Sequence, residues 1–213
     1  MNKQKGFVVP LIIIIVLLIG GIYFLNKEIR RKTTQIASES NGSATTTSDV
    51  ITYVNQKAGY QIDYPKGFVP TYSNIDATSG PNVSYAFPES FTKGTNLSTD
   101  SAIKVETVQA KTCNVKSFFA DEDPGTIKSS KIDNAGVFSQ MASSTGAAAG
   151  NRYEKVVFAA GPNAGMCYGV QLFIHTSVLE NYPAGTVKAY DRAKIDQIFD
   201  KMLSSFKFVS STH

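Results

Sequence analysis

The stretch "ITYVNQKAGYQIDYPKGF", Ile51 to Phe68, carries the clearest fold signal in this chain of 213 residues. From Tyr60 to Tyr64 apolar and polar residues alternate, which is typical of a half-buried strand. Gly59 precedes this strand and Pro65-Lys66-Gly67 ends it, so turn residues mark both of its boundaries. The stretch therefore predicts a β-hairpin at the start of a folded domain.

Further strand patterns follow along the chain, at Ser84–Phe87, Ala102–Gln109, Tyr153–Ala160 and Met166–His175. The last two predict an antiparallel pair joined around the sequence "GPNAG". Five apolar residues share one face of the final strand, and we expect that face to be core: Met166, Tyr168, Val170, Leu172 and Ile174.

The C-terminal segment changes to a helical period. Its apolar residues follow the spacing of one helix face: Ile195, Ile198, Phe199, Met202, Leu203 and Phe206. Asp191 and Thr186 are candidate caps, and a second, short helix is predicted at Asn114–Ala120. Strands followed by an amphipathic helix predict an α+β domain in which the helix covers the apolar face of the sheet.

Both ends of this domain resemble PsbP-like domains. "YVNQKAGYQIDYPKGF" (53–68) is similar to the first hairpin of that family, and "IDQIFDKMLSSFKF" (195–208) is similar to its final helix and strand. Phe68 stands where Trp is more usual, and the middle of the chain aligns loosely. The resemblance implies a PsbP-like α/β/α sandwich in a membrane-anchored bacterial member. It implies no activity, and no residues match that would transfer the role of the plant relatives at photosystem II.

An apolar segment precedes the domain. After the basic residues 1–6, residues 7–25 contain no charged side chain. As a helix with a rise of about 1.5 Å per residue they span roughly 28 Å, close to the thickness of the hydrocarbon core of a bilayer. We expect a transmembrane helix in contact with membrane lipid. Residues 26–50 form a basic flank and a Ser/Thr-rich, flexible linker, and the globular domain covers 51–210.

The N-terminus leaves two alternatives open. "KQKGF" resembles a type IV prepilin leader, in which cleavage between Gly6 and Phe7 would yield a minor pilin-like structural subunit. That family usually carries Glu at the fifth position after the cut, where this chain has Leu11, so an uncleaved signal anchor is favoured. Basic residues flank both ends of the apolar segment and leave its orientation nearly balanced. The family resemblance favours a single-pass protein of the cytoplasmic membrane with its C-terminal domain outside the cytoplasm.

The charge distribution argues against nucleic-acid binding. The net charge of +4 comes mainly from the first 50 residues, and the domain is almost neutral, with 15 basic and 14 acidic residues. Binding to a phosphate backbone requires a basic surface, which this composition lacks.

The chain has two cysteines, Cys113 and Cys167, and neither lies in a Cys-x-x-Cys motif. In an exported protein they are expected to form a disulfide, whereas in a cytosolic protein they would be two separate buried thiols. Two thiols are too few for a structural zinc site, and the sequence predicts no metal and no cofactor.

Two weaker site candidates remain. The small-residue stretch before Arg152 and Tyr153 is typical of a long hairpin connection and is also a candidate ligand loop, with Gly146 and Gly150 allowing close approach of a ligand to the backbone. His175 falls on the face of its strand opposite the apolar stripe, which favours a hydrogen-bonded strand-end histidine over a catalytic base.

No catalytic motif accompanies these residues. The sequence therefore favours a non-enzymatic interaction or accessory module at the cell envelope, with a protein as its partner. The alternatives are the pilin-like subunit and a hydrolase-type enzyme that uses His175.

Overall fold

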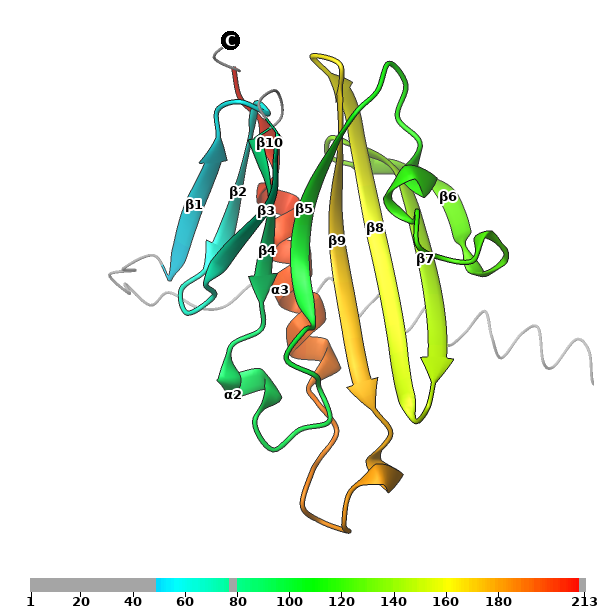
Figure 1. Cartoon of the computed structure of the whole chain (residues 1–213). Coiled ribbons are helices and arrows are strands. Elements are labelled where there is room, and N and C mark those ends of the chain that lie inside the picture. Colours follow the sequence, from blue (N-terminus) through cyan, green and yellow to red (C-terminus); the bar gives the residue numbers. More distant parts are fainter. Residues whose placement is uncertain (1–48, 77–79, 211–213) are drawn as a thin grey trace, which may run out of the picture. The chain divides into compact units, whose positions relative to one another are not determined.

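The computed structural model describes residues 49–76 and 80–210 (Figure 1). The predicted transmembrane segment 7–25, the Gly6-Phe7 junction and nearly all of the linker lie outside these residues. Among the helices that are described, none has the length and apolar character needed to cross a bilayer.

The described residues form two antiparallel sheets. The small sheet has the strand order β1-β2-β10, with β1 at Val50–Asn55, β2 at Tyr60–Pro65 and β10 at Lys207–Phe208. This confirms the predicted hairpin. Gly59 has a φ of 68°, a left-handed conformation that favours glycine, and its N–H donates to the Asn55 carbonyl at 2.8 Å.

The large sheet has seven strands in the order β3-β4-β5-β9-β8-β7-β6. Their bounds are β3 Pro70–Asp76, β4 Gly80–Ala86, β5 Ala102–Gln109, β6 Lys128–Ala135, β7 Phe138–Ala148, β8 Asn151–Asn163 and β9 Met166–Ser177. The predicted strands correspond to β4, β5, β8 and β9, whereas β3, β6 and β7 were not predicted. A four-residue helix, α2 (Glu89–Thr92), and a 3-10 turn, η3 (Leu179–Asn181), lie in connections.

One face of the large sheet, which we call the inner face, faces the main core. On β9 it presents Tyr168, Val170, Leu172 and Ile174, each at most 3% exposed. The predicted core face of this strand is therefore confirmed. The small sheet and the helix α3 (Arg192–Ser205) pack against this face (Figure 1).

Helix α3 begins where the sequence predicts. The Asp191 carboxylate accepts a hydrogen bond from the Lys194 backbone N–H at 3.0 Å, whereas the Thr186 hydroxyl donates to the Pro183 carbonyl and does not cap the helix. Ile195, Phe199 and Met202 on the predicted apolar face are buried. The predicted covering of the sheet by this helix is confirmed.

The opposite face, the outer face, is covered over part of its area by residues 110–127. This segment contains the 3-10 turns η1 (Val115–Phe118) and η2 (Pro124–Thr126). The helix predicted at 114–120 is present only as the single 3-10 turn η1, with Asn114 as its N-cap. A long-range contact fixes the start of this turn: the side chain of Gln140 accepts from the Val115 N–H at 3.1 Å and donates to the Cys113 carbonyl at 2.9 Å.

The sandwich prediction is therefore confirmed in part. The described chain is an α+β fold dominated by antiparallel sheets, with a 14-residue helix on the inner face and only short 3-10 turns on the outer face.

Candidate functional site

The predicted disulfide is present. Cys113 and Cys167 are bonded, with their Cα atoms 5.4 Å apart. Cys167 lies on the outer face of β9, and Cys113 lies just before η1. The bond therefore attaches the covering segment 110–127 to a central strand of the large sheet.

Beside the disulfide, the covering segment approaches the sheet closely. A Cβ placed on Gly169 would lie 2.7 Å from the Phe118 ring, so only glycine leaves room for this ring. Phe118 and Phe119 are buried in a second, smaller core together with Val115, Val157 and Ala159.

The candidate ligand stretch has a different structure from the predicted one. Gly146 lies within β7, and Arg152 and Tyr153 lie within β8, so the expected long loop is a two-residue turn at Ala149 and Gly150. The prediction of a loop was wrong because the strands pair up to the turn, with Ala148 opposite Asn151 and Gly146 opposite Tyr153.

Arg152 and Tyr153 point to opposite faces of the sheet. Arg152 is paired with Ala147 and Thr176, on the inner-face side, whereas Tyr153 stacks on His175 with ring centroids 4.5 Å apart on the outer face. The adjacent cation and ring therefore do not form one binding surface, because successive side chains of a strand alternate.

The structure does bring Arg152 beside a cavity. This cavity has a volume of about 480 Å3 and lies at the turn end of β7 and β8. Gly146 and Tyr153 contribute to its lining, whereas Gly150 does not. The lining also includes Thr145, Arg152, Glu154, Ile174, Thr176 and Tyr190.

An ion-pair network reaches this cavity through Glu154, which is one of its lining residues. The guanidinium of Arg192, the first residue of α3, donates to both carboxylate oxygens of Glu154 at 2.5 and 2.8 Å, and to Asp196 at 2.7 Å. Hydrogen bonding to Glu154, with a smaller contribution from Asp196, raises the pKa of Arg192 above its usual value. The network fixes the beginning of α3 against β8.

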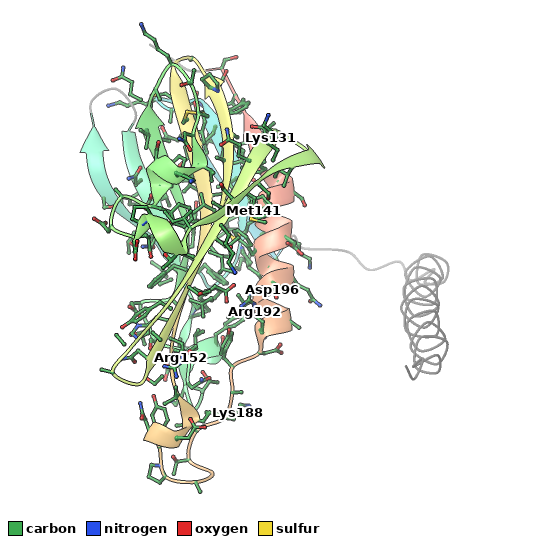
Figure 2. The ribbon with its side chains drawn as sticks, turned by 90° about the vertical axis from the view of Figure 1, so that its right-hand side faces the viewer. Lys131, Met141, Arg152, Lys188, Arg192 and Asp196 are labelled. Carbon is green, nitrogen blue, oxygen red and sulfur yellow. A yellow bond between two sulfur atoms is a disulfide. The ribbon has the colours of Figure 1, made fainter. Side chains whose placement is uncertain are left out.

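The rest of the cavity rim is also held in place. The Val178 N–H donates to the Gly150 carbonyl at 2.8 Å, and the Tyr190 N–H donates to the Asn96 side chain at 3.1 Å. The connection between β9 and α3 is therefore fixed at both of its ends. Figure 2 shows Arg152, Lys188 and Arg192 toward one end of the domain and Lys131 toward the other.

His175 lies on the outer face, away from this cavity. Its Nδ1 contacts the two carboxylate oxygens of Asp100 at 2.9 and 3.0 Å. Its Nε2 is buried and has no hydrogen-bond partner among the described residues. The nearby hydroxyl of Ser101 bonds to the backbone of His175 instead of its ring, so the described residues place no hydroxyl nucleophile at Nε2.

Within residues 49–76 and 80–210, no three His, Cys, Asp or Glu side chains gather as a metal site would require. A second cavity of about 420 Å3 lies near the end of α3 and is lined mainly by apolar side chains, among them Val137, Phe138, Phe158, Leu203 and Phe206.

Several lining residues were not identified from the sequence. The lining residue Glu154 and its partner Arg192 are 38 positions apart, and the lining residue Tyr190 lies in a connection without a strand or helix pattern. No local spacing joins them, because only the pairing of β8 with β9 and the placement of α3 bring them together.

Comparison with known proteins finds similarity to solved structures only. No protein-family model matches it, and no curated protein sequence does. It is similar to a crystal structure from Bacteroides thetaiotaomicron, with 7% identity and a TM-score of 0.45 over 76% of this chain and 49% of that one, so the chain spans about half the length of that protein. It is also similar to the solution structure of the cyanobacterial PsbP protein, CyanoP, from Synechocystis, with 14% identity and a TM-score of 0.34 over 80% of this chain and 98% of that one.

Proposed function

We propose that this protein is a membrane-tethered, non-enzymatic binding module whose folded domain works outside the cytoplasm. The observation that carries the proposal is the Cys113–Cys167 disulfide. Disulfides persist in oxidising compartments and are rare in the cytosol, where thiols are kept reduced. The bond thus favours an extracytoplasmic location, which the balanced charges around residues 7–25 leave undecided.

The sequence before the domain supports the tether. The apolar segment 7–25 has the length and composition expected of a membrane helix, and a Ser/Thr-rich stretch separates it from the domain in the sequence. PsbP-like membership is part of the proposal. In its support, the two stretches that resemble this family meet in the structure, because β10 pairs with β2 in the small sheet.

The arrangement of polar groups favours binding over catalysis. His175 is oriented by Asp100 and stacked on Tyr153, without a hydroxyl at its second ring nitrogen among the described residues. The cavity beside Arg152, by contrast, combines a cation, the carboxylate of Glu154 that is paired with Arg192, hydroxyl groups and apolar surface, which is the composition of a ligand pocket.

The location is tested on intact cells that express the full-length chain. We expect added protease to remove the domain while a cytoplasmic marker stays intact, and a thiol-reactive reagent to label Cys113 and Cys167 only after reduction. Protection of the domain together with free thiols in unreduced cells would contradict the proposal. A mature N-terminus at Phe7, measured by mass spectrometry, would instead support the pilin-like alternative.

A further inference from the structure

The charges around the cavity at the turn end of β7 and β8 are unequally paired. Both carboxylate oxygens of Glu154 already accept hydrogen bonds from Arg192, so this carboxylate is engaged within the protein. The Arg152 guanidinium, in contrast, has one hydrogen bond, to the backbone carbonyl of Asn151 at 2.9 Å, and no carboxylate partner among the described residues. Arg152 is therefore a cation at the cavity that no described carboxylate engages.

The other lining groups suit the uncharged part of a small molecule. Thr145 and Thr176 offer hydroxyl groups, while Ile174 and Tyr190 offer apolar surface. Ile174 is 3% exposed and Thr176 is 8% exposed, so both lie deep in the wall. A volume of about 480 Å3 falls within the usual range of small-molecule sites.

We propose that this cavity binds a small organic carboxylate, with Arg152 holding the carboxylate group. A guanidinium presents a planar pair of N–H donors that matches the two oxygens of a carboxylate. Arg152 can pair with one carboxylate, whereas phosphate carries more charge and needs more donors than this wall presents, and the Glu154 carboxylate in the same wall repels it more strongly. The assignment rests on the proposed binding function and names the ligand class of its site.

The test uses the full-length protein in detergent micelles and two probes of nearly equal shape, 4-fluorobenzoate and 4-fluorobenzamide. Binding is measured as the broadening of the fluorine NMR signal above that in protein-free micelles. We expect the benzoate to bind at least about tenfold more tightly than the neutral amide, a difference of the size a single charge-assisted pair provides.

Two variants localise this preference. Arg152→Gln should remove it, so that benzoate and amide bind alike, whereas Lys131→Gln, which removes an exposed cation at the other end of the domain, should leave it intact (Figure 2). If Arg152→Gln does not fold, Arg152→Lys keeps the charge without the planar fork and should weaken benzoate binding severalfold.

Equal binding of the two probes by the unmodified protein, the same loss in Lys131→Gln, or displacement of benzoate by an equal concentration of inorganic phosphate would overturn the assignment. These outcomes are independent of membrane topology, because the protein is purified. The protease and thiol experiment on intact cells can therefore fail while the carboxylate site stands, and the reverse also holds.

Discussion

The two faces of the large sheet are covered in different ways. The inner face is covered by α3 and the small sheet, through many buried aromatic and aliphatic side chains. The outer face is covered only in part, by a segment without regular helix that depends on a small core and one disulfide. Apolar burial with non-covalent polar contacts, such as the Arg192–Glu154 pair, holds the first covering, whereas the second combines burial with a covalent bond, as expected where too little apolar area is available.

The uncovered part of the outer face is polar. Lys104 lies over the ring of Phe173, Gln171 donates to Glu106 at 2.9 Å, and Asp100 pairs with His175. These contacts engage outward side chains of β5 and β9, while Gln171 Oε1 and His175 Nε2 have no hydrogen-bond partner among the described residues. One sheet thus supports a conventional core on its inner face and a covering held by a disulfide on its outer face. The stabilities of the two coverings can be measured separately.

The largest loss of stability is expected on the inner face, for Tyr168→Ala. The Tyr168 ring contacts Tyr60, Phe206 and Phe208, and its hydroxyl donates to the Ala58 carbonyl. A cavity of this size together with an unsatisfied carbonyl should lower the free energy of unfolding by about 5 kcal/mol, measured by urea titration. Tyr168→Phe keeps the ring and should lose only about 1 kcal/mol. Similar losses of unfolding free energy for the two variants would show that packing of the ring contributes little to stability.

Removal of the disulfide is expected to cause the next largest loss of stability. Cys113→Ala with Cys167→Ala releases a loop closed over a sequence separation of 54 residues, and the chain-entropy model gives a loss of about 4 kcal/mol. Hydrogen exchange should show the greatest loss of protection in 110–127 and little change in α3. An equal loss of protection in α3 would mean that the two coverings are not independent.

Gly169→Ala tests the outer covering without altering the disulfide. The added methyl group would overlap the Phe118 ring, so η1 must shift away from the sheet, at an expected cost of about 1–3 kcal/mol. The second variant, Phe118→Ala, creates the missing space, and in its background Gly169→Ala should cost much less. A double-mutant cycle of urea titrations measures this coupling, and additive losses would contradict the close contact.

The smallest effect concerns a buried hydroxyl beneath the small sheet. Burial, with neighbouring tyrosines, raises the pKa of Tyr85, and its hydroxyl has no hydrogen-bond partner among the described residues. The unfolded phenol ionises near pH 10, before the folded one, so this group's contribution to stability is complete below pH 10 and is lost as the pH rises further. Tyr85→Phe should leave stability near pH 7 equal or raised by up to about 1 kcal/mol. It should also reduce the fall in stability between about pH 9 and 11. An unchanged fall would show that ionisation of Tyr85 does not cause it.

The sequence predicted the inner face better than the outer face. β9 and α3 have regular apolar periods, because one face of each is buried along its whole length. The outer covering has no such period: η1 is shaped by Gln140 from a strand that was not predicted. β7 itself is rich in Ala, Ser, Thr and Gly, and it is extended because β8 pairs with it, a contact that no local pattern encodes.

The same limit applies to the candidate site. Arg152 was identified as a candidate because it follows small residues, but its position beside Glu154 and Arg192 depends on strand register and on the placement of α3. Tyr153 was grouped with Arg152 by sequence proximity, and the strand separates them onto different faces. Adjacent residues in a loop can contact the same ligand, whereas adjacent side chains in a strand point to opposite faces of the sheet.

The small sheet also sets the order in which the domain can be completed. β1 and β2 come before the other described strands, but β10, which pairs with β2, ends at Phe208 and is synthesised more than 140 residues later. One edge of the first hairpin therefore stays unpaired until α3 and β10 have been synthesised. A chain that ends within α3 would expose that edge, and β10 thus completes the folding of the domain.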